Sequence, residues 1–178
     1  MGNIKLHDKE FELFISEVTL TKRIEELAEQ INKDYRDNPP LVIGVMNGVF
    51  VFASDLYREL EGDVQITFVR LMSYQGLKST GNVVSAIGLE EDIKDRDVLL
   101  LEDIIDTGRT LHSFLQELVA KQPKSIKIAT LLFKPSALQY DLQPNYIGFE
   151  IENKFVVGYG LDYNGLGRNL KSIYQLAN

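Results

Sequence analysis

A cluster of acidic and hydroxyl-bearing residues follows a short apolar run in the segment VLLLEDIIDTGRTL, residues 98–111. Glu102 and Asp103 end the run, and Asp106 opens a short loop. Neighbouring carboxylates accept hydrogen bonds from vicinal hydroxyls and bind divalent cations such as magnesium, which prefers oxygen ligands. They repel anions, so an anionic group of the same ligand would have to be held by another part of the segment.

The loop after the acidic pair has the composition of an anion-binding loop. Thr107 and Thr110 supply hydroxyls, Gly108 allows close approach of the backbone, and N–H groups at the start of the next helix can converge on a phosphate. Without the lysine of a Walker A loop, a nucleoside triphosphatase is disfavoured. Taken alone, the pattern is equally compatible with a capped helix and solvated acids. A phosphate, a diol and a metal together indicate a sugar phosphate.

Hydrophobic periodicity predicts the elements that must position these residues. Short apolar strands alternate with amphipathic helices, which indicates an α/β fold with a mostly parallel twisted sheet and helices on both faces. Ligands of such sheets bind beyond the carboxyl ends of the strands, where we expect Glu102 and Asp103. The polar, glycine-punctuated residues 72–82 suggest a lid loop. We expect strands at 41–45, 64–71, 98–101 and 126–133, and helices at 20–36, 49–60 and 110–121.

Composition limits the classes of function. With 178 residues and 44% hydrophobic content, one domain over residues 1–178 is expected. The chain has no cysteine, and His7 and His112 are its only histidines, which argues against disulfides and a zinc site. A net charge of -7 argues against nucleic-acid binding. Charges near the start and strand-sized apolar runs predict a cytoplasmic protein without signal peptide or membrane span.

The central segment resembles the phosphoribosyl-pyrophosphate binding motif of type I phosphoribosyltransferases. Nearly the whole chain resembles the hypoxanthine and hypoxanthine-guanine branch of that family, and the segments that carry the likeness are GVMNGVFVFASDL, SYQG, LLFKPSA and NKFVVGYGLDYNGLGRNL. The resemblance implies a small hood formed by terminal segments beside the sheet. It also implies purine salvage: phosphoribosyl transfer from phosphoribosyl pyrophosphate to a 6-oxopurine, with magnesium, in a homodimer or homotetramer.

The same resemblance assigns roles around the sugar. Glu102 and Asp103 would hold the ribose hydroxyls, partly through magnesium, and their charge would favour a cationic sugar centre. Asp106 would be the catalytic residue that faces purine N7 and exchanges a proton with it. We expect the Asp106 side chain to be partly shielded from water for this role. The 5′-phosphate would be bound by the loop Asp106, Thr107, Gly108, Arg109 and Thr110.

On the purine side, the resemblance assigns Lys134 to the exocyclic oxygen at position 6. Adenine presents a donor there, so its binding would be less favourable by a free energy on the order of several kcal/mol. Phe155 would stack on the base while the backbone of Val156 reads its edge. Asp162 would contact magnesium-bound water near the purine, and Arg168 would reach the pyrophosphate. Each residue alone also fits an ordinary strand end or surface position.

The sequence differs from the family pattern at two places, and it also contains the residues of an expected lid. Asn47 stands where many relatives carry Lys or Arg, although its N–H group and that of Gly48 can still donate to pyrophosphate. The residues 165–167, Gly-Leu-Gly, replace bulkier ones and suggest a more mobile segment. Ser73 and Tyr74 resemble the pair that closes over the reactants, which protects an electrophilic sugar from water.

Other functions remain open on the sequence. A regulator that keeps the fold and binds RNA, as pyrimidine-operon attenuators do, should have a basic face, which the negative charge disfavours. A xanthine- or guanine-preferring transferase is a nearer alternative, because backbone groups read position 2 of the purine. An adenine transferase is disfavoured by Lys134, and a dinucleotide-dependent dehydrogenase by the lack of G-x-G-x-x-G after a strand.

Overall fold

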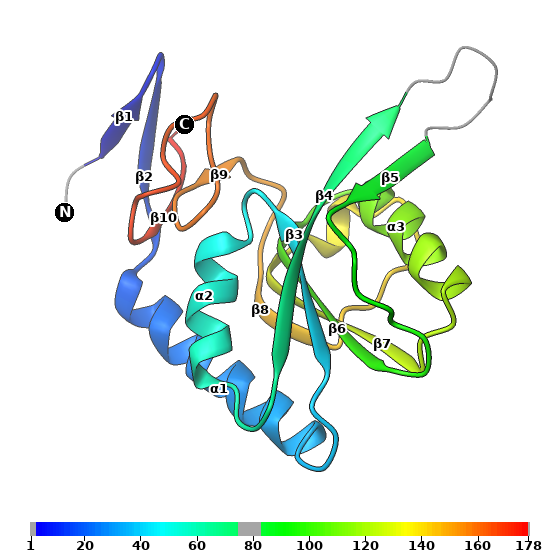
Figure 1. Ribbon diagram of the computed structural model, residues 1–178. Coiled ribbons are helices and arrows are strands. Elements are labelled where there is room, and N and C mark those ends of the chain that lie inside the picture. The colour runs from blue at the N-terminus through cyan, green and yellow to red at the C-terminus, as the bar shows by residue number, and fades with distance from the viewer. Residues whose placement is uncertain (1–2, 75–82, 178) are drawn as a thin grey trace.

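A six-stranded sheet forms the centre of the molecule. The computed structural model describes residues 3–74 and 83–177. For residues 72–74 and 83–87 it describes the backbone but not the side chains. In the order β5-β4-β3-β6-β7-β8, all strands are parallel except β5, which runs antiparallel to β4 (Figure 1). The strands are β3 (Leu41–Met46), β4 (Gln65–Tyr74), β5 (Val83–Ile87), β6 (Asp97–Ile105), β7 (Ser125–Phe133) and β8 (Tyr146–Glu150).

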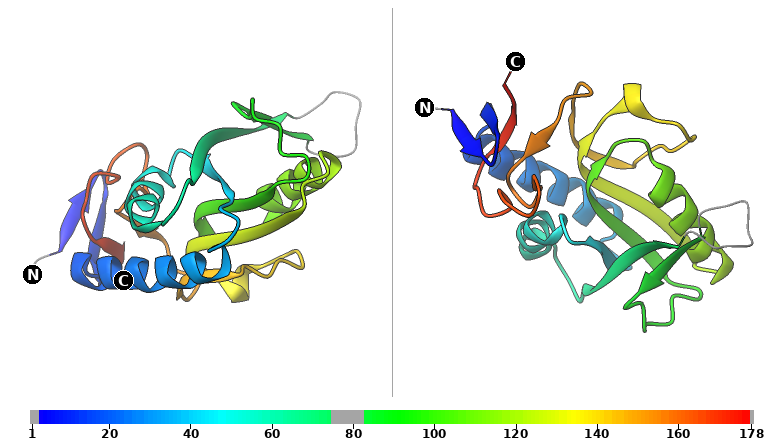
Figure 2. Two further views of the ribbon diagram at one scale, coloured as in Figure 1. Left: turned by 60° about the horizontal axis from the view of Figure 1, so that its bottom comes forward. Right: turned by 90° about the horizontal axis from the view of Figure 1, so that it is seen from above.

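Helices cover both faces of this sheet, as expected from the sequence (Figures 1 and 2). Helices α1 (Glu17–Asp34) and α2 (Phe50–Glu59) bury Leu27 and Phe52 with Leu99 and Leu101 on one face. On the other face, α3 (Arg109–Ala120) packs Phe114 and Leu118 against Leu41 and Leu100. Alternate residues of β6 thus face opposite cores, so this strand is buried on both sides. No helix within the described part of the chain is long and apolar enough to span a membrane.

A second, four-stranded antiparallel sheet forms the hood that the resemblance implied. Its order is β1-β2-β10-β9, so the N-terminal and C-terminal segments lie side by side (Figure 1). Sequence reasoning did not predict these strands: β1, β9 and β10 are very short, and the sheet joins segments distant in sequence. They are β1 (Ile4–Leu6), β2 (Lys9–Ile15), β9 (Val156–Val157) and β10 (Ile173–Leu176).

Strand β6 is longer than the sequence predicted, and this changes the setting of the acidic pair. The ladder to β7 continues through Glu102, opposite Thr130, to Ile105, whereas pairing with β3 ends at Leu101. The expectation that the pair follows the strand was therefore wrong: β7 supplies ladder partners beyond Leu101. On the β3 side, the described residues give β6 no ladder partner beyond Leu101, and the turn after β3 lies against Asp103 instead.

The predicted lid falls mostly outside the described residues. Ser73 and Tyr74 lie at the end of β4, where their backbones pair with Val84 and Val83 of β5. Their side chains and residues 75–82 are outside the described part of the structure, so the lid remains a prediction.

Candidate active site

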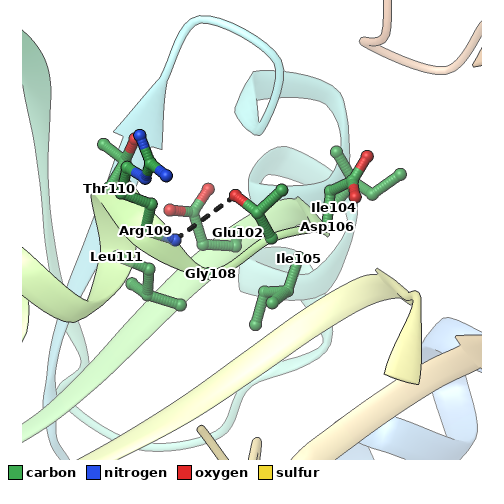
Figure 3. A pocket seen from close by; sticks show the side chains of 9 residues that line it. Glu102, Ile104, Ile105, Asp106, Gly108, Arg109, Thr110 and Leu111 are labelled. Atoms are coloured by element: carbon green, nitrogen blue, oxygen red, sulfur yellow. Dashed lines mark hydrogen bonds between the residues drawn. The ribbon is translucent and has the colours of Figure 1, made fainter. Parts of the chain in front are cut away.

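Two adjoining pockets lie at the carboxyl edge of the parallel sheet. The first, of about 160 Å³, is lined by Glu102 and residues 104–111 (Figure 3). The second, of about 180 Å³, is lined by Asp103, Ile104, Asp106, Lys134, Phe155, Val156, Leu161, Asp162 and Arg168. Ile104 and Asp106 belong to both, and they project to the same side of the strand end. The residues that the sequence assigned to sugar and base thus meet in one place.

The first pocket is formed by the loop that leads into α3. Gly108 precedes the helix with a φ of 73°, a conformation that favours glycine. A Cβ at Gly108 would lie 2.5 Å from Cδ1 of Leu142, so a side chain there would also require the end of that leucine to move. Thr107 Oγ1 accepts a hydrogen bond from the N–H of Arg109 at 3.4 Å (Figure 3). Within α3, which is described throughout, the first turn has no acidic residue and no side-chain cap at Gly108, so the N–H groups of Thr110 and Leu111 are available to an anion.

The two adjacent carboxylates open into different pockets. Glu102 lines the first pocket and Asp103 the second. Burial, followed by the charge of Asp103, raises the pKa of Glu102 well above its ordinary value. Burial raises the pKa of Asp103 to about 6, although hydrogen bonds from backbone N–H groups and the charge of Arg168 act in the opposite direction. The ion pairs of the described residues include neither carboxylate.

This pair of carboxylates fits a divalent cation whose remaining coordination positions are filled by oxygen atoms of water and of the bound ligand. Buried acids without a cationic partner are costly, and a metal ion would offset that cost. Among the described residues, no group of three acidic, histidine or cysteine side chains forms a ready-made cage. Magnesium is commonly bound by one or two carboxylates, with the remaining positions filled by water and phosphate oxygens. Asp162 is held differently: its carboxylate pairs with Arg168 at 2.6 Å and accepts from the N–H of Gly165 at 2.7 Å.

The turn after β3 lies directly against Asp103 of the acidic pair. Gly48 is buried next to Asp103, and a Cβ on it would come within 1.6 Å of Oδ2 of Asp103. A larger residue at this position would therefore have to displace the carboxylate of Asp103. Asn47 is exposed beside it, after a cis peptide bond from Met46. The turn is thus placed beside the carboxylates, although neither residue lines the two pockets.

Lys134 is buried in the second pocket and is not a solvated lysine. It is 5% exposed, and its Nζ lies 2.9 Å from Oδ2 of Asp106. Asp106 itself has 46% of its side-chain surface exposed, so it is partly shielded from water, in agreement with the expectation. Lys134 covers one side of the carboxylate, and the pockets leave the other side open.

The hood supplies the remaining wall. Phe155 is 45% exposed at the rim and meets the edge of Tyr163 with ring centroids 5.7 Å apart. Val156 lies in β9, the edge strand of the hood sheet. Arg168 pairs with Asp162 and donates from Nη1 to the carbonyl oxygen of Gly160 at 2.6 Å.

Sequence reasoning missed four apolar lining residues: Ile105 and Leu111 in the first pocket, Leu161 in the second, and Ile104 in both. Ile104 lies between the acidic pair and Asp106, and Leu161 precedes Asp162, so proximity to the motif residues was the available signal. Their side chains have no chemistry that marks them as ligand-binding in the sequence.

Comparison with known proteins agrees with this geometry. Residues 17–164 match the family model described as phosphoribosyl transferase domain. The hypoxanthine-guanine phosphoribosyltransferase of Aquifex aeolicus is 36% identical, with 97% of this chain and 98% of that protein covered. A bifunctional TilS/HprT protein of Listeria monocytogenes is 40% identical over 97% of this chain, which spans 27% of that protein's length.

A solved structure is also similar over nearly the full length. The crystal structure of a hypoxanthine-guanine phosphoribosyltransferase from Bacillus anthracis superposes with a TM-score of 0.85 and 37% identity, covering 94% of this chain and 99% of that one. The match of the family model over most of the chain, together with these relatives, shows that the chain belongs to the phosphoribosyltransferase family.

Proposed function

We propose that this enzyme transfers the phosphoribosyl group of phosphoribosyl pyrophosphate to hypoxanthine, and also to guanine, with release of pyrophosphate. The products are IMP and GMP, which makes the reaction one of purine salvage. The observation that carries the proposal is the junction of the two pockets, with a helix N-terminus in one, a buried lysine in the other and Asp106 in both. The names of the relatives support the choice of purine.

The sugar phosphate is held by the first pocket and the acidic pair. Thr107, Gly108, Arg109 and Thr110 bind the 5′-phosphate through hydroxyls and backbone N–H groups at the start of α3. Glu102 and Asp103 accept hydrogen bonds from the ribose hydroxyls. Because the pair opens into both pockets, the C1 atom of the ribose comes to lie near their junction.

Magnesium is the cofactor that fits the acidic pair, with Glu102 and Asp103 as ligands and Asp162 in contact with bound water. When bound, it supplies positive charge that stabilises the departing pyrophosphate. The backbone N–H groups of Asn47 and Gly48, together with Arg168, bind the same pyrophosphate from the protein side. Without a basic side chain at Asn47, the backbone carries a larger share of this binding.

In the reaction, a purine ring nitrogen attacks C1 of the ribose as the bond from C1 to the pyrophosphate oxygen breaks. The sugar centre gains cationic character, which the nearby carboxylates favour. Asp106 faces N7 of the purine and accepts the proton that the ring loses as the new bond to C1 forms. Ser73 and Tyr74 belong to a lid that excludes water while the centre is electrophilic.

Purine selection rests on Lys134. Its ammonium group has three N–H donors, and Asp106 accepts one of them. The others can donate to the oxygen at position 6 of hypoxanthine or guanine, whereas adenine presents an amino group that leaves a buried donor unpaired. Phe155 stacks on the base, and the backbone of Val156 reads its edge.

The proposal extends to the setting of the enzyme. Residues 1–178 act as one phosphoribosyltransferase domain in the cytoplasm, where a chain without cysteine needs no oxidising compartment. A homodimer or homotetramer is the expected assembly, and light scattering after size-exclusion chromatography measures it.

Pyrophosphate release tests the function. Wild type is supplied with phosphoribosyl pyrophosphate, magnesium and, in parallel, hypoxanthine, guanine, xanthine or adenine. We expect turnover with the first two bases, little with adenine, and a loss of about 100-fold in Asp106→Ala. Asp141→Ala, at an exposed position outside both pockets, is the matched control. Retained binding of phosphoribosyl pyrophosphate without turnover of any base would favour a regulator instead.

A further inference from the structure

The segment that follows β9 of the hood contacts the turn after β3, and a glycine from each side, Gly160 and Gly48, forms this contact. Gly160 has a φ of 99°, and a Cβ on it would lie 2.1 Å from the carbonyl oxygen of Gly48. Gly48 in turn lies against the carboxylate of Asp103. Asp103, Gly48 and Gly160 are therefore stacked without space for a side chain on either glycine. A displacement of Gly160 would be transmitted directly to the turn.

Arg168 fixes one side of Gly160. The N–H of Gly160 donates to the carbonyl oxygen of Arg168 at 3.0 Å, and Arg168 Nη1 donates back to the carbonyl oxygen of Gly160 at 2.6 Å. The guanidinium group also pairs with Asp162 in the second pocket. The position of this guanidinium group therefore depends on where Gly160 lies.

Tyr159 fixes the other side through a contact with α2. The residue is 6% exposed, and its hydroxyl donates a hydrogen bond to the carboxylate of Asp55. Burial and this hydrogen bond raise the pKa of Tyr159, so the hydroxyl remains a donor at all ordinary pH values. Asp55 lies in the second turn of α2, and this helix begins at Phe50, directly after the β3 turn. The bond therefore ties the hood to the helix that the turn leads into.

We infer that Asp55 and Tyr159 are positioning residues for pyrophosphate binding, an inference that rests on the proposed function. Their hydrogen bond holds Gly160 against Gly48, and so sets where the backbone N–H groups of the β3 turn and the Arg168 guanidinium point. Backbone donors cannot adjust as a long lysine side chain can, so the presence of Asn47 makes the site more dependent on this placement. Displacements of the order of 1 Å are enough to impair such sites.

Binding of two ligands that differ only in pyrophosphate tests the inference. Calorimetry with magnesium measures the affinities of phosphoribosyl pyrophosphate and ribose 5-phosphate for wild type and Tyr159→Phe, a change that removes one hydroxyl. We expect phosphoribosyl pyrophosphate to bind about tenfold more weakly to the variant, the scale of one charge-assisted hydrogen bond. Ribose 5-phosphate should bind within about twofold of wild type, because the first pocket is unchanged.

Three further variants separate positioning from general stability. Asp55→Ala should reproduce the selective loss, whereas Asp55→Asn keeps an acceptor oxygen and should restore most of the affinity. Tyr163→Phe also removes a hydroxyl of the hood, one that donates to Asp8 on the exposed side, and should leave both affinities unchanged.

An equal loss for both ligands in Tyr159→Phe, or no loss for either, would overturn the positioning role. Neither result depends on turnover. If wild type turns over no purine but Tyr159→Phe still loses affinity for phosphoribosyl pyrophosphate selectively, the positioning role stands and the proposed reaction fails. If wild type does not bind phosphoribosyl pyrophosphate, both fail.

Discussion

Replacing Asp103 by Asn should stabilise the ligand-free protein, and the gain should grow with pH. Burial raises the pKa of this carboxyl from its ordinary 3.8 to about 6. At pH below 3.8 it is protonated in the folded and unfolded states, so it costs nothing. Above pH 6 it is ionised in both, and the folded state carries the full cost of burying the charge. At about 1.4 kcal/mol for each pKa unit, that cost reaches about 3 kcal/mol at pH 8 and about 1 kcal/mol at pH 4.5.

Urea unfolding of wild type and Asp103→Asn at the two pH values, with a chelator present, measures the difference. Asparagine keeps the size of the side chain and the oxygen that accepts from the N–H of Ile104. The variant should therefore gain about 3 kcal/mol in free energy of unfolding at pH 8 and about 1 kcal/mol at pH 4.5. Asp141→Asn, at an exposed position, is the control. A gain that is the same at both pH values, or a loss at pH 8, would refute the electrostatic reasoning.

Three further changes test other parts of the site. Gly108→Ala should raise the KM for phosphoribosyl pyrophosphate about tenfold or more in steady-state kinetics, because of its positive φ and the contact with Leu142; an unchanged KM would contradict the role of the loop. Phe155→Leu should raise the KM for hypoxanthine about tenfold through lost stacking and leave that for phosphoribosyl pyrophosphate unchanged; a change in the latter alone would contradict the assignment. Magnesium should raise the melting temperature of wild type in a thermal-shift assay, and the rise should be smaller in Asp103→Asn, since one of two carboxylate ligands loses its charge; equal rises would place the metal elsewhere.

Features that depend on neighbouring residues were predictable from the sequence. The helices at α1, α2 and α3 follow from their apolar periodicity, and the loop at Gly108 from its composition. The residue at which β6 ends was not predictable in the same way, because residues 102–105 pair with β7, more than twenty positions further along the chain. A strand end is decided by its neighbour in the sheet, and the sequence of one strand does not contain that information.

Contacts between distant segments were also beyond the sequence. The pairing of Lys134 with Asp106 and of Tyr159 with Asp55 depends on how loops and the hood pack. Motif resemblance brought Lys134 and Asp106 into one site through their family roles, without indicating that they contact each other. Asp55 and Tyr159 carry no assigned role in the motifs, so only the fold connects them to the β3 turn.

The most direct test of the central claim is the ratio of kcat/KM for hypoxanthine to that for adenine, measured in wild type and in Lys134→Gln. We expect wild type to favour hypoxanthine by about 1,000-fold or more, because adenine leaves a buried donor unpaired. Lys134→Gln should lose most of this preference, since an amide can either donate or accept, and Lys94→Gln on the surface should keep it. Comparable use of adenine and hypoxanthine by wild type, or an unchanged ratio in Lys134→Gln, would contradict the assignment of this site to 6-oxopurines.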